Sequence, residues 1–275
     1  MAVVITVATQ KGGVGKTTTV VNLACALAAK PFHKRVLVVD VDPQANASTT
    51  LGTVNPAKQA ITVAALFDDD PTKTFAYAAT ESKYKGVDLI PSNIDLFAVG
   101  QQLSGPATVM ALENKLDSVT LDSYDFIIVD CPPNLGGPFV VNAMIISDYF
   151  IIPVESASIY ATMGMDQFLK SIDAVKGYSR HKLGILGVLI TKYDPRTTAA
   201  KVIEDMLGKR FGDLMFKTKI SRSTSLEQAT MMSQAVAEMK AGRRSTAAKD
   251  YKELAAEVIQ RCGMELPKNL ADDGE

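Results

Sequence analysis

Residues 8–19 of the chain read ATQKGGVGKTTT. A β-branched run at 3–7 precedes this stretch, and an Ala-, Leu- and Val-rich run without Gly or Pro follows it at 20–29. The stretch therefore joins a predicted strand to a predicted helix. Glycines in such a loop allow successive backbone N–H groups to point inward at a phosphate, and the helix N-terminus adds partial positive charge. This context predicts a phosphate-binding loop.

The glycines of this loop are not where the general phosphate-loop pattern places them. Counting back from Gly15-Lys16-Thr17, the first glycine of the pattern falls on Gln10, whereas the chain has Lys11 followed by two glycines. This form resembles the deviant Walker A loop of the ParA/MinD family of ATPases. From the phosphate-loop pattern we expect Lys16 to reach the β- and γ-phosphates and Thr17 to coordinate Mg²⁺. The loop residues expected to contact the nucleotide are Lys11, Gly12, Gly13, Val14, Gly15, Lys16, Thr17 and Thr18.

Carboxylates follow two further predicted strands. The apolar run at 36–39 leads into Asp40 and Asp42, with a proline next in the sequence, and the run at 126–129 leads into Asp130 and a double proline. Carboxyl ends of parallel strands share one edge of a doubly wound sheet, so these groups are predicted to lie beside the phosphate loop. The two segments resemble switch I and the Walker B strand of ParA proteins. The predicted Mg²⁺ set is Thr17, Asp40 and Asp130, with Asp130 acting through a coordinated water.

Strands alternating with helices predict an α/β fold with a doubly wound, mostly parallel sheet covered on both faces, as in P-loop NTPases of the deviant Walker A type. The chain has 275 residues, and 47% of them are hydrophobic. We expect a single ATPase domain at 1–262 and a flexible acidic tail at 263–275. Three widely spaced cysteines without a C-x-x-C pair, and no signal-peptide pattern, favour a reducing cytoplasm. The longest apolar stretch is too short and too polar to span a bilayer.

The family resemblance, which covers nearly the whole chain, implies chemistry for several of these residues. ATP would be sandwiched in a homodimer, with Lys11 crossing to the partner subunit's nucleotide as an extra catalytic cation. Asp42 is the candidate for positioning the attacking water, and Asp40 for supporting the metal and water network. Segments after two later strands would approach the adenine, and these contribute Pro153, Glu155, Thr191 and Lys192.

Charge is unevenly distributed along the chain. The net charge is −1, yet residues 176–261 carry 17 Lys or Arg against 9 Asp or Glu. This basic part is compatible with either DNA phosphates or ordinary solvated helix faces. Within it, residues 219–229 resemble a segment that helps chromosomal ParA relatives bind DNA without sequence preference, although Ser221 replaces their proline. The candidate DNA contacts are Arg222 by its matching position, and Lys219, Arg243 and Arg244 by charge alone.

The resemblance implies a ParA-like ATPase that segregates or positions a plasmid, chromosome or protein cargo from the nucleoid. Its partners would be nonspecific DNA and a ParB-like or other cargo-bound stimulator of hydrolysis. Alternatives are a MinD-like membrane-associated ATPase or an enzyme-accessory ATPase of the same family. The acidic tail with its proline disfavours the basic amphipathic anchor of the first, so no membrane partner is expected. The second includes electron-transfer ATPases, which require paired cysteines at a dimer interface; only Cys131 lies near a predicted switch.

Overall fold

The computed structural model describes residues 1–103, 106–134, 136–156, 165–178 and 183–267. Seven strands form one sheet in the order β3-β4-β2-β5-β1-β6-β7, and every neighbouring pair is parallel except β3 with β4. The strands are β1 (Val3–Val7), β2 (Val36–Asp40), β3 (Thr80–Glu81), β4 (Val87–Ile90), β5 (Phe126–Asp130), β6 (Tyr149–Glu155) and β7 (Gly184–Thr191). The predicted mostly parallel sheet is confirmed, and the antiparallel edge strand β3 is an addition within a stretch whose sequence pattern is weak.

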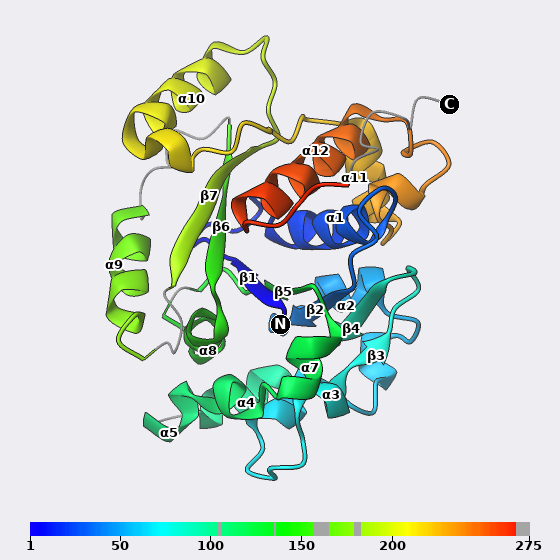
Figure 1. Ribbon diagram of the computed structural model, residues 1–275, viewed down its shortest axis with the longest axis vertical. Coiled ribbons are helices and arrows are strands. Elements are labelled where there is room, and N and C mark those ends of the chain that lie inside the picture. The colour runs from blue at the N-terminus through cyan, green and yellow to red at the C-terminus, as the bar shows by residue number, and fades with distance from the viewer. Residues whose placement is uncertain (104–105, 135, 157–164, 179–182, 268–275) are drawn as a thin grey trace.

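Helices lie on both sides of this sheet (Figure 1). The helices before β5 are α1 (Lys16–Ala28), α2 (Asn46–Leu51), α3 (Phe75–Ala78), α4 (Leu96–Gln102), α5 (Pro106–Val109), α6 (Ala111–Lys115) and α7 (Ser118–Ser123). Those after it are α8 (Pro138–Ile146), α9 (Met165–Val175), α10 (Thr198–Phe211), α11 (Thr224–Met231) and α12 (Thr246–Arg261). Short 3₁₀ turns occur at Pro56–Lys58, Val63–Phe67, Gly212–Leu214 and Val236–Glu238.

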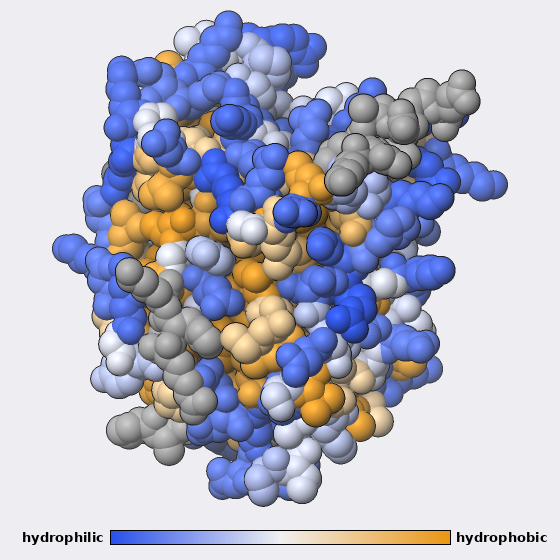
Figure 2. All heavy atoms as spheres, in the orientation of Figure 1, coloured by the Kyte–Doolittle hydropathy of each residue, from blue (hydrophilic) through white to orange (hydrophobic). Residues whose placement is uncertain are grey.

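The strands are buried on both faces because their side chains alternate between two cores. In β2, Val36 and Val38 belong to the core that includes residues of α1 and α12, whereas Leu37 and Val39 belong to the core that includes residues of α8. A strand covered on both faces is apolar throughout rather than alternating with polar residues. Figure 2 shows the consequence on one side of the molecule, where hydrophilic residues cover the outer helices α9 and α10 and apolar residues gather over β6 and β7.

No helix in the described ranges is both long and apolar enough to cross a bilayer. The sequence also predicts helices at 160–175, 199–211 and 247–262, and the last two agree with α10 and α12 to within a residue at each end. Of the tail expected at 263–275, residues 268–275 lie outside the described residues, and so does the first part of the helix predicted at 160–175.

Candidate nucleotide and magnesium site

The predicted site residues lie together at the carboxyl edge of the sheet. The loop after β1, the residue Asp42 after β2, and Thr191 and Lys192 at the end of β7 all line one cavity of about 660 Å³. Asp40 and Asp130 end the neighbouring strands β2 and β5 and face each other in register. The topology of the parallel sheet therefore brings together groups from four strands, as expected for a doubly wound fold.

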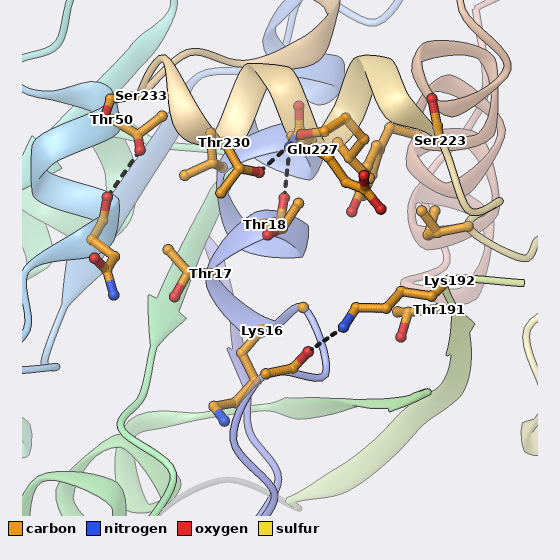
Figure 3. A pocket seen from close by; sticks show the side chains of 18 of the residues that line it. Lys16, Thr17, Thr18, Thr50, Thr191, Lys192, Ser223, Glu227, Thr230 and Ser233 are labelled. Carbon is orange, nitrogen blue, oxygen red and sulfur yellow. Dashed lines mark hydrogen bonds between the residues drawn. The ribbon is translucent and has the colours of Figure 1, made fainter. Parts of the chain in front are cut away.

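The loop backbone has the shape that a phosphate requires. Gly13 has φ 74° and Gly15 has φ 90°, a left-handed region in which a side chain is strained, so glycine is needed at both positions. Gly15 is the N-cap of α1, and the helix N-terminus opens into the cavity with Lys16, Thr17 and Thr18 (Figure 3). The Lys16 Nζ donates to the Lys11 carbonyl at 3.0 Å, and its pKa is lowered chiefly by burial. A desolvated ammonium at a helix N-terminus is poised for a phosphate.

Asp130 is the residue that best fits a divalent cation. Both carboxylate oxygens are buried, and neither has a hydrogen-bond partner within the described residues. Burial, followed by the charge of Asp40, raises the pKa of Asp130. The Thr17 hydroxyl lies close enough to oppose this rise. A buried carboxylate that its neighbours compensate only in part is costly, and a Mg²⁺ ion with its waters would compensate it further and offset the charge of a bound nucleotide.

No group of three or more His, Cys, Asp or Glu that could hold a metal occurs in the described part of the chain. Magnesium is commonly held by one or two protein groups together with nucleotide phosphates and water. The Thr17 hydroxyl and Asp130 are therefore a sufficient protein contribution.

Both carboxylate oxygens of Asp40 accept hydrogen bonds within the chain. Its Oδ1 accepts from the Asp42 N–H at 3.1 Å, and its Oδ2 accepts from the Ser48 N–H at 2.9 Å and the Ser48 hydroxyl at 2.7 Å. These bonds hold Asp42 and the start of α2, and the expected support of Asp40 for the metal and water network stays a prediction. Burial raises the pKa of Asp40 to about 6 even though these bonds oppose the rise.

Asp42 keeps the position expected for a group that polarises water. It lines the cavity, and its Oδ1 accepts from the Gln44 N–H at 2.9 Å in a turn that directs the chain into α2. Ala45, the N-cap of α2, has φ 53°. The segment between β2 and α2 is therefore bent sharply and held by side-chain bonds at both ends.

Ser48 connects three elements at this point. Its hydroxyl donates to Asp40 and accepts from the N–H of Ser92, which follows β4, at 2.7 Å.

Replacing Ser48 with Ala leaves Asp40 and the Ser92 N–H each without one buried hydrogen-bond partner. We expect Ser48→Ala to lower the free energy of unfolding by about 1–3 kcal/mol. Urea unfolding measures the change, and Thr50→Ala on the same helix is the matched hydroxyl loss, with an expected cost of less than about 1 kcal/mol. Equal costs for the two variants would contradict the assignment.

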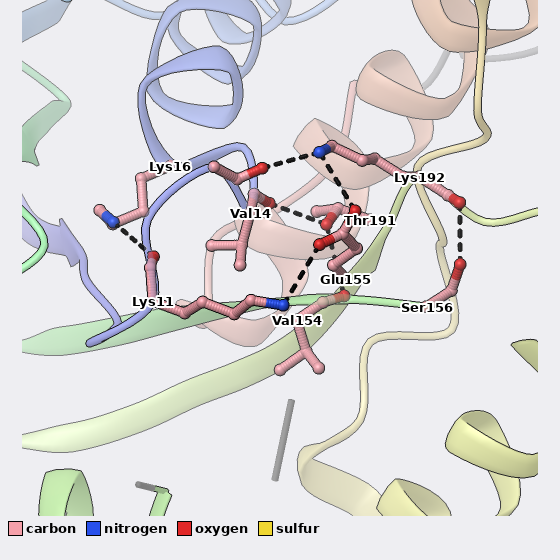
Figure 4. Close-up of polar contacts among 9 residues, drawn as sticks. Lys11, Val14, Lys16, Val154, Glu155, Ser156, Thr191 and Lys192 are labelled. Atoms are coloured by element: carbon pink, nitrogen blue, oxygen red, sulfur yellow. Dashed lines mark hydrogen bonds and ion pairs between the residues drawn. The ribbon is translucent and has the colours of Figure 1, made fainter. Parts of the chain in front are cut away.

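Lys11 does not line the cavity. Its Nζ lies 3.5 Å from Glu155 Oε2, and Glu155 Oε1 lies 3.2 Å from the Lys192 Nζ (Figure 4). The Lys192 Nζ also donates to the Gly13 carbonyl at 2.8 Å. The ammonium of Lys11 is thus turned away from the cavity that contains Lys16, and an ion pair holds it at the end of β6.

Of the four residues expected near the adenine, two line the cavity. Lys192 does so, and so does Thr191, whose hydroxyl donates to the Val14 carbonyl at 2.8 Å and ties β7 to the phosphate loop. Pro153 is not among the residues that line the cavity. The strand β6 continues to Glu155, so Pro153 is buried within it opposite Leu189 and not at its end. Glu155 ends the strand but faces the lysines instead of the cavity.

The far wall of the cavity comes from a segment that we assigned to DNA. Residues of α11 and its flanking turns line the cavity, among them Arg222, Leu226 and Thr230, together with Tyr251 of α12. Asn22 of α1 holds this wall in place, because its Oδ1 accepts from the Val236 N–H at 2.8 Å. No local pattern marks these residues, since their place depends on how α11 packs over α1.

The DNA candidates differ in their surroundings. Lys219 is paired with Glu204 and lies over the Tyr193 ring, which reduces its value as a phosphate contact. The Arg222 side chain is 71% exposed at the rim of the cavity and lies 3.9 Å from Glu227. Arg243 and Arg244 are exposed just before α12.

Comparison with known proteins agrees with this geometry. A family model described as an AAA domain matches residues 2–185. The sporulation initiation inhibitor protein Soj of Bacillus subtilis is 36% identical over 261 residues, covering 94% of this chain and 98% of the relative. The chromosome partitioning protein ParA of Caulobacter vibrioides is 33% identical over 260 residues, covering 94% of each.

Among solved structures, cobyrinic acid a,c-diamide synthase from Mycobacterium smegmatis with bound ADP and magnesium is similar, with a TM-score of 0.77 and 31% identity. The match covers 97% of this chain and 98% of that one. A phosphate loop with two placed lysines, the buried carboxylate of Asp130 and these relatives agree on one conclusion. The chain belongs to the ParA/MinD family of P-loop ATPases and uses ATP and Mg²⁺.

Proposed function

We propose that this ATPase dimerises on ATP, binds DNA without sequence preference, and is released when a cargo-bound partner stimulates hydrolysis. The observation that carries the proposal is the place of Lys11. Its side chain is 39% exposed and is held outside the cavity that contains Lys16. A cation at the mouth of one site is available to the nucleotide of a second subunit, where it would stabilise charge developing on the γ-phosphoryl oxygens.

Within one subunit, the loop amides and Lys16 bind the phosphates, and Asp42 orients and polarises the attacking water. Thr17 and Asp130 would hold Mg²⁺, which would supply positive charge to the phosphates. Asp40 and Ser48 keep Asp42 in place. Lys11 of the other subunit completes the site, so that hydrolysis depends on dimerisation and its product state favours monomers.

DNA binding is supported by the excess of basic residues in the C-terminal third and by the exposure of Arg222, Arg243 and Arg244. The names of the Bacillus and Caulobacter relatives, with their roles in chromosome partitioning and sporulation, favour a plasmid, chromosome or protein assembly as cargo. We place the ATP-bound dimer on the nucleoid and the stimulating partner, a ParB-like protein or its equivalent, on the cargo.

The test measures mass by light scattering and DNA binding in a salt series, each without nucleotide, with ADP and with ATP. We expect dimers and DNA binding with ATP only, and affinity that falls steeply with salt because phosphate contacts release counterions. Arg222→Glu should weaken DNA binding at least tenfold while ATP affinity changes little. Arg196→Glu, a charge reversal on a side chain that is 86% exposed and paired with Asp194, is the matched control and should have a smaller effect.

A second candidate, an enzyme that uses ATP on a small molecule, comes from the name of the M. smegmatis neighbour, a cobyrinic acid a,c-diamide synthase with bound ADP and magnesium. For this function, the cavity of the present chain would have to hold a small-molecule substrate beside the nucleotide. ATP turnover that is insensitive to dimerisation, with no DNA binding at low salt in any nucleotide state, would reject the partition proposal in favour of this one.

A further inference from the structure

The carboxylate of Glu155 lies between two ammonium groups at the edge of the nucleotide cavity. Oε2 lies 3.5 Å from the Lys11 Nζ and Oε1 lies 3.2 Å from the Lys192 Nζ. The Glu155 side chain is 23% exposed, which is less than either lysine. The acid is therefore the most enclosed member of the group, and the two ammonium groups approach it from different sides (Figure 4).

Two features hold Glu155 in place. It ends β6 in register with Thr191 of β7, so its backbone belongs to the sheet. Lys192, which contacts its other oxygen, is itself held by the Gly13 carbonyl at 2.8 Å and by a left-handed backbone with φ 50°. Because the strand and the contact with Lys192 both support it, the Glu155 carboxylate keeps its position when Lys11 leaves.

The contact with Lys11 is looser. At 3.5 Å it is the longer of the two ion pairs, and a part-exposed pair of this kind is weak enough to break and reform readily. Lys11 also starts the glycine-rich part of the loop, whereas Glu155 belongs to the end of β6. The Lys11–Glu155 pair is therefore the one that can break while the Lys192–Glu155 pair stays formed.

We propose that Glu155 is a positioning residue that restrains Lys11 within its own subunit until ATP-dependent dimerisation draws the lysine away. The inference rests on the proposed function, in which Lys11 acts on the partner subunit's nucleotide. In the nucleotide-free subunit, the pairing keeps the Lys11 ammonium outside its own cavity and away from Lys16. Because the contact must break before Lys11 can cross, it opposes dimerisation in the absence of a phosphate to compensate it.

The first measurement is acetylation of lysines by a water-soluble acylating reagent in nucleotide-free protein, read by mass spectrometry. We expect Glu155→Gln to raise the labelling rate of Lys11 at least threefold, because an amide no longer holds the ammonium as an ion pair. Lys16, which is 7% exposed, is the internal reference and should not change. Asp205→Asn is the matched control, since it removes the partner of Lys209 on α10 and should leave Lys11 unchanged.

The second measurement is the dissociation constant of the dimer with ATP, which Glu155→Gln should lower about three- to tenfold while Glu155→Asp stays near the wild type. Unchanged Lys11 labelling would overturn the restraint, and so would a rise shared by Lys16, which would indicate a loosened fold. A weakened or unchanged dimer would also overturn it. If the wild-type protein forms no dimer with ATP, the proposed function fails, and the labelling experiment still decides whether Glu155 restrains Lys11.

Discussion

Replacing Asp42 with Asn should lower kcat for ATP hydrolysis about 10²- to 10³-fold while ATP affinity changes less than about threefold. The Asn side chain can still accept from the Gln44 N–H through its carbonyl oxygen, as Asp42 Oδ1 does at 2.9 Å. The turn into α2 is therefore retained, and only the negative charge facing the cavity is lost. An interaction used in the transition state and not in the ground state affects kcat without affecting binding.

Single-turnover hydrolysis and a fluorescent-nucleotide titration measure the two quantities for Asp42→Asn. Asp173→Asn, on α9 in an exposed pair with Lys176, controls for the loss of one surface charge. A kcat within tenfold of the wild type would remove Asp42 from the water-positioning role. A parallel loss of ATP affinity would instead assign it to ground-state binding.

Replacing Asp130 with Asn should have opposite effects on stability and function. In metal-free buffer at pH 7.5, we expect the free energy of unfolding to rise by about 1–3 kcal/mol, because the variant no longer buries a carboxylate without a partner. The same change should abolish the additional thermal stability that Mg²⁺ confers on the ATP-bound protein. A residue that costs stability in return for a metal site is typical of a functional position.

The gain in the free energy of unfolding of Asp130→Asn should increase with pH. Burial raises the pKa of Asp130 in the folded protein, so the folded state holds a proton that the unfolded state releases above about pH 4. Wild-type stability from this group is present below that pH and is lost as pH rises toward the folded pKa. The stabilisation by Asn should therefore be small at pH 4 and grow as pH rises.

Urea unfolding with EDTA across this pH range tests the Asp130 prediction. Asp122→Asn, on an exposed position of α7, should show neither the gain nor its pH dependence. Destabilisation of Asp130→Asn by more than about 1 kcal/mol at pH 7.5 would show that the carboxylate is compensated in the metal-free protein.

Much of the fold could be predicted because its signals are local. The left-handed backbones at Gly13 and Gly15 need residues without Cβ, and the chain has them. Strands buried on both faces appear as continuous apolar runs, so β1, β2 and β5 could be recognised, and β2 and β5 end in the carboxylates Asp40 and Asp130. The edge strand β3 has two residues and too short a pattern to be recognised.

The sequence by itself determined the phosphate loop, the carboxylates that follow two of the parallel strands, and the candidates Lys16, Asp42 and Asp130, because each depends on a residue and its near neighbours. Only the tertiary structure decided that Asp40 is occupied by Ser48, that Pro153 is buried, and that α11 walls the cavity. It also decided that Glu155 holds Lys11, across 144 residues of chain. Hydrogen bonds and ion pairs between distant segments depend on packing and register, which no local pattern specifies.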